Sequence, residues 1–246
     1  MSKTRLDQLL VGRGLAPSRA RAQALIADGA ILVAGERATK PGRLVADDAE
    51  LVVAGPVNPW VSRAALKLVH GLDHFGIDPM ARIALDIGAS TGGFSQVLLA
   101  RGATRVYAVD VGTGQLADSL RGERRIISLE KTNARILSAA LVPEPVGIIV
   151  CDASFIGLET VLPAALSLAA VGAFLVALIK PQFEVGPGMV GSGGIVRDRA
   201  LHDAVCTRID AWLAAQPGWR SLGFCDSPIL GSDGNREFIL AGHYLS

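Results

Sequence analysis

Cysteine is scarce in this chain, with only Cys151, Cys206 and Cys225 among 246 residues. The three are far apart and odd in number, so neither a disulfide framework nor a paired-cysteine metal motif is present. A thiol content of this kind suits a reducing compartment. The first residues carry charges and develop no apolar stretch of the signal-peptide type. We therefore expect a cytoplasmic protein.

Long apolar runs are also rare. Residues 160–179 contain no charged side chain and are long enough to span a membrane as a helix. Pro163 and Gly172 interrupt this stretch, and the part after Gly172 is a short apolar run typical of a buried parallel strand. We expect a helix followed by a central strand here, and no membrane span.

Net charge is close to zero, at +1, but it is unevenly distributed. Residues 1–43 hold eight basic residues against three acidic ones. A local excess of positive charge is typical of a module that binds a polyanion, although an ordinary solvated surface fits the same count.

The first part of the chain has the pattern of a small α/β unit. Residues 3–54 contain two short helical stripes, the second capped by Ser18, and short strand patterns at 31–33 and 50–53. Residues 55–60 follow with two prolines, which exclude a continuous helix. We predict a domain at 1–54, a linker at 55–62 and a second domain at 63–246.

A glycine-rich turn dominates the second domain. Leu85-Asp-Ile-Gly-Ala-Ser-Thr-Gly-Gly-Phe94 has the pattern of a strand, a turn and the start of a helix. A second strand ends in Asp110, 24 residues after Asp86, close to the spacing of a ribose-binding acid in doubly wound folds. These two strands predict a nucleoside pocket.

The glycine spacing indicates which nucleoside the pocket takes. Gly88 and Gly92 do not follow the G-x-G-x-x-G pattern that places a pyrophosphate on a helix, so a dinucleotide is disfavoured. Acids at 86 and 110 suit a ligand with a cationic amino-acid end and a ribose, as in S-adenosylmethionine. A glycine-rich turn in some other α/β enzyme remains the alternative.

Strand patterns alternate with helical patterns from residue 64 onward, which predicts a parallel, doubly wound α/β sheet with its ligand crevice at the carboxyl ends of the strands. The fourth strand ends in Asp152 and the fifth in Lys180. Lys67 and Glu237 complete a candidate cluster of charges. A cluster of this kind indicates catalysis, although ion pairs at a sheet edge fit the same pattern.

Several longer motifs carry a resemblance to a known family. They are Ser62–Lys67, Leu85–Phe94, Val106–Gly112, Lys131–Arg135, Cys151–Ile156, Lys180–Gly186, Gly193–Asp198 and Gly234–Phe238. In these motifs the chain resembles the TlyA, or haemolysin A-like, ribosomal RNA 2'-O-methyltransferases over essentially its whole length.

The resemblance implies a small ribosomal-protein-type RNA-binding domain followed by a Rossmann-like, seven-stranded FtsJ-like domain that methylates a cytidine ribose. It implies the following site residues. The catalytic tetrad is Lys67, Asp152, Lys180 and Glu237; the S-adenosylmethionine contacts are Asp86, Gly88, Ser90, Gly92, Gly93, Phe94, Asp110, Asn133 and Asp152; the RNA contacts are Arg5, Arg13, Arg19, Arg21, Lys40 and Arg63.

Lys180 is the candidate general base, because a ribose hydroxyl is a poor nucleophile and needs a positioned proton acceptor. Asp152 and Glu237 are expected to orient the two lysines. The chain departs from the family at Thr113 and Asp118, where aromatic residues are common, which affects the expected base contacts. The large ribosomal subunit is favoured as target, with the small subunit as alternative.

Two other functions fit parts of the sequence, namely a membrane-active haemolysin and an RNA-binding protein without catalysis. A metal site is not expected. His70 and His74 stand four residues apart on a predicted helix, a spacing that suits a shared metal, but no third ligand is evident.

Overall fold

The computed structural model describes residues 2–27, 29–54, 58–186 and 188–246. The chain divides into two compact units, residues 1–63 and 64–246. Part of the predicted linker, residues 55–57, lies outside the described residues. Each unit has its own apolar core, so the two are described separately.

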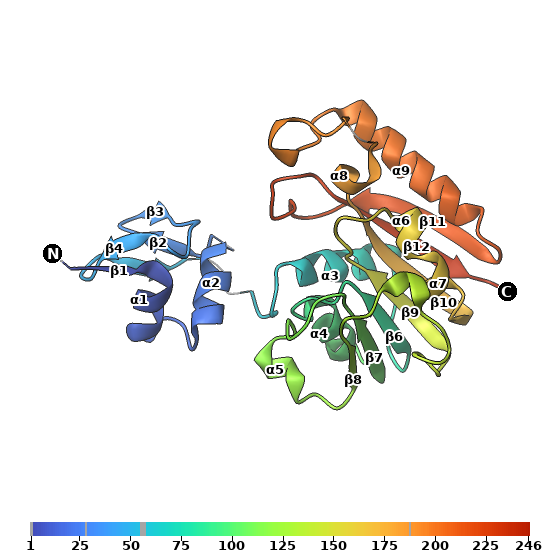
Figure 1. Ribbon diagram of the computed structural model, residues 1–246, viewed down its shortest axis with the longest axis horizontal. Coiled ribbons are helices and arrows are strands. Elements are labelled where there is room, and N and C mark those ends of the chain that lie inside the picture. Colours follow the sequence, from blue (N-terminus) through green and yellow to red (C-terminus); the bar gives the residue numbers. More distant parts are fainter. Residues whose placement is uncertain (1, 28, 55–57, 187) are drawn as a thin grey trace. The chain divides into compact units, whose positions relative to one another are not determined.

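The amino-terminal unit contains two helices and five short strands (Figure 1). The strands are β1 (Lys3–Arg5), β2 (Ile31–Val33), β3 (Glu36–Arg37), β4 (Leu44–Ala46) and β5 (Leu51–Val53), and the helices are α1 (Leu6–Gly12) and α2 (Arg19–Ala27). β1 pairs with β4, and β2 lies between β3 and β5, with every pair antiparallel.

Both predicted helices are confirmed, and Ser18 caps α2, its Oγ accepting a hydrogen bond from the Arg21 amide at 3.2 Å. The predicted strands at β2 and β5 are confirmed as well. The prediction missed β1 and β4, because each is only three residues long and gives too little alternation to detect. Leu6, Leu10 and Ile26 are fully buried and form the centre of this core.

The second unit alternates strands and helices (Figure 1). Its strands are β6 (Ile83–Ile87), β7 (Arg105–Val109), β8 (Ile126–Leu129), β9 (Val146–Cys151), β10 (Ala169–Ile179), β11 (Trp219–Asp226) and β12 (Phe238–Tyr244). Its helices are α3 (Ala64–Phe75), α4 (Gly93–Ala100), α5 (Asp118–Arg121), α6 (Leu158–Val161), α7 (Pro163–Leu166), α8 (Pro181–Glu184) and α9 (Arg199–Ala214), with short 3-10 turns η1 (Ala134–Ile136) and η2 (Ser192–Gly194).

Among the described residues the seven strands form one sheet in the order β11-β12-β10-β9-β6-β7-β8. The pairs from β10 to β8 are parallel, as predicted. The expectation of a wholly parallel sheet is wrong for β12, which is antiparallel to both of its neighbours. β12 follows β11 without an intervening helix, and a connection of that kind joins antiparallel strands.

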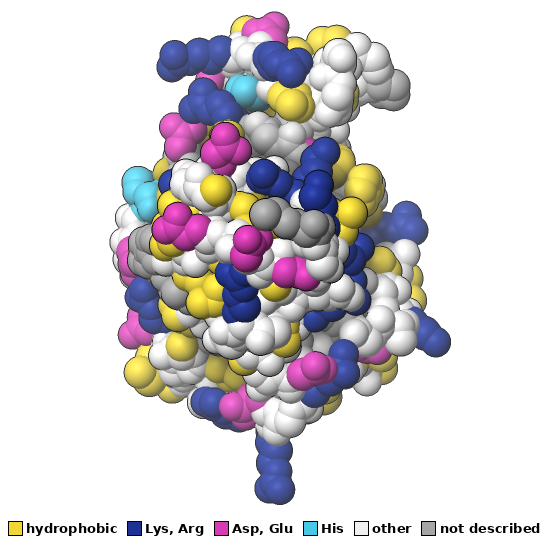
Figure 2. Space-filling view, turned by 90° about the vertical axis from the view of Figure 1, so that its left-hand side faces the viewer, with side chains coloured by type: hydrophobic (Ala, Val, Ile, Leu, Met, Phe, Trp, Pro, Cys, Tyr) yellow, Lys and Arg dark blue, Asp and Glu magenta, His cyan; other side chains and the backbone are white. Residues whose placement is uncertain are grey.

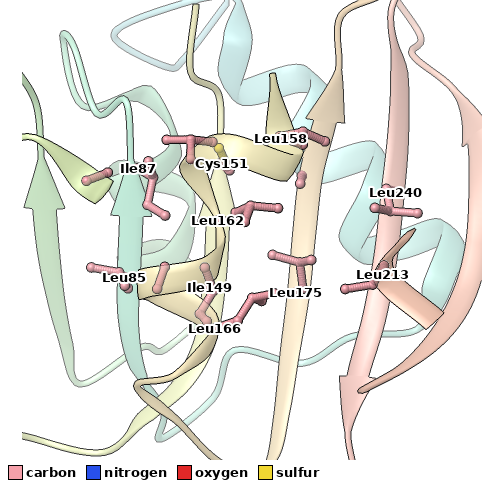
Figure 3. Packing of buried hydrophobic residues seen from close by; sticks show 14 of the residues in the cluster. Leu85, Ile87, Ile149, Cys151, Leu158, Leu162, Leu166, Leu175, Leu213 and Leu240 are labelled. Carbon is pink, nitrogen blue, oxygen red and sulfur yellow. The ribbon is translucent and has the colours of Figure 1, made fainter. Parts of the chain in front are cut away.

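Apolar side chains cover both faces of the sheet. Figure 3 shows Leu158 of α6, Leu166 of α7 and Leu162 between the two helices, all packed over the inward residues of β6 and β9. α9 extends the same core with Leu213, and α3 and α4 pack on the opposite face. The carboxyl ends of the parallel strands are left at one edge of this layered structure, where the loops carry the polar residues predicted to act.

Residues 160–179 end α6, form α7 and continue into the eleven-residue strand β10, which confirms the prediction of helix followed by strand. β10 lies between β9 and β12 and is buried over most of its length. Within the described ranges we find no helix with the length and apolar content needed to cross a membrane.

Candidate active site

The glycine-rich turn after β6 requires glycine at two positions. Gly88 has φ +78°, and a Cβ atom there would lie 2.9 Å from the carbonyl oxygen of Asp152. Gly92, at φ +90°, precedes α4, and its Cβ would lie 2.6 Å from side-chain carbons of Leu116 and Leu120. L-residues rarely adopt such angles, and both positions also lack space for a side chain. The turn is therefore packed directly against the end of β9.

Asp86 is fully buried beneath α4. Its Oδ2 accepts a 2.6 Å hydrogen bond from the hydroxyl of Ser95, while Oδ1 has no hydrogen-bond partner within the described residues. Burial raises the pKa of Asp86 to about 7, the charges of Asp152 and Asp110 add to this rise, and the Ser95 hydrogen bonds oppose it. A buried carboxyl group with one open oxygen is suited to a cationic ligand group.

An open pocket lies beside the turn, along the ends of β6, β7 and β8. Asp110 is held there by backbone amides, because its Oδ2 accepts from Ser90 N at 2.8 Å and its Oδ1 from Gly112 N at 2.7 Å. The lining residues are Ala89, Ser90, Ala108, Asp110, Gly112, Gln115, Leu116, Ser128 and Glu130. Carboxylates beside apolar side chains match the polar and apolar halves of a nucleoside.

Glu130 is a pocket residue that sequence reasoning missed. It directly follows β8, as Asp110 follows β7, and its Oε1 accepts a hydrogen bond from Gly114 N at 2.8 Å. The same signal that identified Asp110, an acid at the end of a predicted strand, would have found it.

Of the nine predicted cofactor residues, Ser90 and Asp110 line this pocket. Asn133 uses its Oδ1 to cap η1, accepting from Arg135 N at 3.0 Å. Phe94 is buried in the core, and Gly93 begins α4. A motif in the sequence cannot show which member of the turn points inward.

The four predicted catalytic residues form two ion pairs, in which Asp152 is half-buried and the other three side chains are buried. Lys180 Nζ lies 2.6 Å from Asp152 Oδ1, and Lys67 Nζ lies 2.5 Å from Glu237 Oε2. β9, β10 and β12 are neighbours, and Ile179 at the end of β10 pairs with Phe238 at the start of β12. Three adjacent strands therefore place Asp152, Lys180 and Glu237 at the same edge of the sheet. Lys67 of α3 contacts Glu237 there.

Lys180 has further acceptors around its ammonium group. Ser154 Oγ lies 3.0 Å from Nζ, and the backbone oxygen of Asp152 lies 3.4 Å away. These two hydrogen bonds and the ion pair with Asp152 define the position of Nζ on several sides. Ser154 was not predicted, although it belongs to the same motif as Asp152.

Phe155 is the most conspicuous side chain that the prediction left out. It is 89% exposed and has φ +65°, an uncommon backbone angle for an aromatic residue. Its ring lies 5.0 Å from that of Phe183, centroid to centroid, and Lys180 Nζ lies 6.0 Å from the Phe183 centroid. Phe183 thus lies against both the exposed Phe155 ring and Lys180, and the backbone strain at Phe155 is of a kind that clusters at functional sites.

The buried side chain of Asn235 fastens the loop that contains residues 186–194. Its Nδ2 donates to the carbonyl of Gly194 at 2.9 Å, and its Oδ1 accepts from Val196 N at 2.9 Å. Asn235 lies two residues before Glu237, so it ties this loop to the strand that delivers the carboxylate. Residue 187 of the same loop lies outside the described residues.

In the amino-terminal unit, two of the predicted RNA-binding arginines surround the buried carboxylate of Asp7. Arg5 and Arg19 each donate to Asp7, at 3.0 and 2.9 Å, and Gln23 donates at 2.9 Å. The hydrogen bonds from Arg5 do most to hold the pKa of Asp7 well below its usual range, against the effect of burial. Asp7 therefore fixes where these two guanidinium groups lie.

The remaining predicted RNA contacts differ in their surroundings. Arg13 donates to the backbone oxygens of Ala49 and Asp47, and Arg21 donates to Asn58 O at 2.6 Å, so both also hold the unit together. Lys40 is exposed, and Arg63 is half-buried at the end of this unit. On the face in Figure 2, lysine and arginine side chains are interspersed with acidic ones rather than forming one continuous basic surface.

Breaking one of the buried ion pairs should destabilise the second unit. We expect Lys67→Met to cost about 3–5 kcal/mol of unfolding free energy, because Glu237 is left buried without its partner. Adding Glu237→Gln should recover much of this loss. Urea denaturation of the single and double variants measures the coupling, and strictly additive losses would contradict the role of the pair.

The burial of Asp86 should produce a pH-dependent stability. Its pKa is raised from 3.8 to about 7 in the folded state, so ionisation favours the unfolded chain as pH rises between these values. The stability of Asp86→Asn relative to the unmodified protein should therefore increase from pH 4 to pH 7. The expected increase is a few kcal/mol, because each unit of pKa shift corresponds to about 1.4 kcal/mol. Urea denaturation at pH 5 and pH 8 without ligand tests this, and an equal difference at both would contradict it.

Comparison with known proteins places the chain among enzymes. Residues 60–244 match the FtsJ-like methyltransferase family, and residues 4–51 match the S4 domain. The 16S/23S rRNA (cytidine-2'-O)-methyltransferase TlyA of Mycobacterium tuberculosis is 48% identical, with 97% of this chain and 89% of that protein covered.

Two solved structures are also similar. One from Streptococcus thermophilus, provisionally named a hemolysin, is 38% identical with a TM-score of 0.77 and covers 100% of this chain and 90% of its own. The N-methyltransferase NodS of Bradyrhizobium japonicum, solved with S-adenosyl-L-homocysteine, shares the fold alone, with 15% identity, a TM-score of 0.52, and 77% of this chain and 89% of its own covered. The chain thus belongs to the FtsJ-like methyltransferase family, in the TlyA branch that joins an S4 domain to the catalytic domain.

Proposed function

We propose that this protein transfers a methyl group from S-adenosylmethionine to the 2'-hydroxyl of a cytidine ribose in ribosomal RNA, in the cytoplasm. The supporting observation is that the Gly88 turn packs against the backbone of Asp152, whose side chain pairs with Lys180. A nucleoside pocket and a buried lysine therefore share one sheet edge. We favour the large ribosomal subunit as target, with the small subunit as the alternative, and the M. tuberculosis relative is named for both RNAs.

S-adenosylmethionine, when bound, supplies a methyl group on a positively charged sulfonium. Asp110 and Glu130 offer carboxylate oxygens to the ribose hydroxyls, and Ala89 and Leu116 offer apolar surface to the adenine. The open, buried oxygen of Asp86 favours the cationic amino-acid end. The donor set of this chain thus matches each part of the cofactor.

Lys180 acts as the general base in this proposal. In its neutral form Nζ keeps a lone pair, accepts the proton of the 2'-hydroxyl and leaves the oxygen free to bond to the methyl group. Asp152 and Ser154 position the nitrogen, at 2.6 and 3.0 Å. The side chain of Lys180 is 9% exposed, so few water molecules compete for the proton.

Lys67 and Glu237 act as positioning residues beside Lys180. Their ion pair connects α3 to the start of β12, and β12 pairs with the end of β10. The pair therefore restrains the strand end from which Lys180 emerges, and it adds a fixed charge distribution to the site.

Phe155 provides the surface on which the target base stacks. Single-stranded and flipped bases stack on exposed aromatic rings, and Phe155 presents such a ring close to Lys180 through Phe183. Thr113 and Asp118, which stand where the family commonly has aromatic residues, are both exposed and polar. Phe155 offers the base contact that these two positions do not.

The S4 domain is the proposed RNA-binding module. Arg5, Arg19 and Lys40 present cationic groups at its surface, while Arg13 and Arg21 combine that role with support of the domain itself. Arg63, at the end of the unit, is the sixth proposed contact. Phosphate contacts of this kind supply affinity that depends strongly on salt.

The two alternative functions receive less support. A haemolysin needs a membrane-active segment, and the stretch considered for that role forms α7 and the buried strand β10. An RNA-binding protein without catalysis would not need two ion pairs with three buried charges at a sheet edge, because such charges are costly to bury.

Substitutions at the base and in the donor pocket should separate catalysis from cofactor binding. We expect Lys180→Ala to abolish methyl transfer and to change S-adenosylmethionine affinity by no more than about threefold, since it removes only the proton acceptor. Asp110→Ala should weaken cofactor binding first. Methyl transfer to ribosomal RNA from a strain lacking this gene, followed by mapping of 2'-O-methylated sites, measures the first effect, and calorimetry measures the second.

Ser221→Ala, in β11, serves as a control for general damage and should leave both quantities unchanged. Near-normal turnover in Lys180→Ala would exclude lysine as the base. Modification of a base atom instead of a ribose would exclude the proposed reaction.

Removal of residues 1–60 should leave a folded domain that binds S-adenosylmethionine but methylates RNA poorly. The core of the second unit contains only residues beyond 64, so the cut exposes none of it. Full-length binding to RNA should weaken steeply with salt, and the truncated chain should show a shallower slope because phosphate contacts are lost. Filter binding at several salt concentrations measures both slopes.

Circular dichroism provides the control that the truncated chain is folded. Equal RNA affinity and equal salt slopes in the two forms would reassign the S4 domain to a structural or protein-binding role.

A further inference from the structure

A third side chain lies beside the two histidines of α3. The ligand atoms of His70, His74 and Cys225 all lie within 4.8 Å of one another. We propose that these three residues bind a divalent transition metal ion, Zn²⁺ as the best match, and thereby fasten α3 to the edge strand β11. This site is separate from both the tetrad and the nucleoside pocket, since none of its residues belongs to either.

The packing of α3 explains why the three residues meet. A Cβ atom at Gly71 would lie 2.9 Å from Ile239 and 3.1 Å from Val176, so glycine lets the helix approach the sheet closely. His70 and His74 lie on the same flank of the helix, one turn apart. Cys225 is the register partner of Ile239. Directly paired residues project to the same face of a sheet, so the thiol lies on the face that α3 covers.

The donor atoms match zinc chemistry. Imidazole nitrogens and a thiolate are common zinc ligands, and three protein ligands leave a fourth, tetrahedral position for water. In such a site neighbouring ligand atoms are separated by about 3.5 Å, since metal-ligand bonds are about 2.0–2.3 Å long. The present separations, of at most 4.8 Å, exceed this value by little more than 1 Å, and the His74 ring is exposed.

The three side chains are also available for a metal. Within the described residues neither His70 nor His74 has a hydrogen bond through its ring nitrogens, and their rings stack at 5.9 Å. By contrast, Nε2 of His202 is engaged with the carbonyl of Val196. Cys225 is a free thiol. Metal binding at this site therefore releases the thiol proton.

A metal here would support the catalytic edge without touching substrate. Lys67 precedes His70 by one turn of α3, and β11 pairs with β12, which begins after Glu237. The metal would thus connect α3 to β11, next to the place where the Lys67–Glu237 ion pair connects the same helix to the start of β12. Its role is structural, and its loss should lower stability before it affects chemistry.

Cobalt titration of the full-length protein, freed of metal by a chelator, tests the proposal. Co²⁺ should give a thiolate charge-transfer band and the visible bands of a tetrahedral site, and Zn²⁺ should displace it in a one-to-one ratio. Cys225→Ser should lose the charge-transfer band, and His74→Gln should weaken Zn²⁺ binding by about 100-fold or more, at least the effect of losing an outer-shell partner. Zn²⁺ should raise the melting temperature of the unmodified protein but of neither variant.

His243→Gln is the matched control. His243 of β12 stacks on Phe174 of β10 and is not part of the cluster. It should bind Co²⁺ like the unmodified protein. His74 is exposed, so its substitution should not disturb folding, and circular dichroism checks this. No stoichiometric binding, a spectrum without the thiolate band, or equal Zn²⁺ affinity in the His74 and His243 variants would each overturn the proposal.

Discussion

The contact between the Gly88 turn and the backbone of Asp152 is the constraint on which the active edge depends. β6 and β9 are neighbouring parallel strands, so their carboxyl ends emerge together. The Cβ atom of any side chain at residue 88 would clash with the carbonyl oxygen of Asp152. Because the turn carries no side chain there, the pocket that follows β6 and the carboxylate that follows β9 share one wall. Proximity of donor and acceptor sites is thus a property of strand pairing rather than of flexible loops.

Two buried carboxyl groups illustrate how surroundings separate structural from functional acids. Asp7 is surrounded by Arg5, Arg19 and Gln23, which stabilise its charge and lower its pKa. Asp86 has Ser95 as its side-chain hydrogen-bond donor, and its pKa is raised instead. The first carboxyl has its partners in the folded chain, whereas the second retains capacity for a partner from outside. Burial alone therefore does not distinguish the two roles.

Features that depend on neighbours along the chain could be predicted, and features that depend on pairing could not. Asp152 and Lys180 could be predicted because each directly follows an apolar run, and the sequence alone shows where such a run ends in a charged residue. The antiparallel insertion of β12 was missed, since nothing local shows which strand a segment joins. For the same reason the sequence could not show that Cys225 lies near His74, which is more than a hundred residues away along the chain. Asn133 matched a motif, yet its amide was already used in a cap.

The position of β12 also has a consequence for biosynthesis. β12 is made after the other six strands of the sheet, yet it lies inside it, between β10 and β11. Until β12 has left the ribosome, the apolar strand β10 has an unpaired edge, and β11 has no place in the sheet. Glu237 enters the site with the same segment. The sheet can therefore be completed only after residues 238–244 have been synthesised, however much of the rest has folded before them.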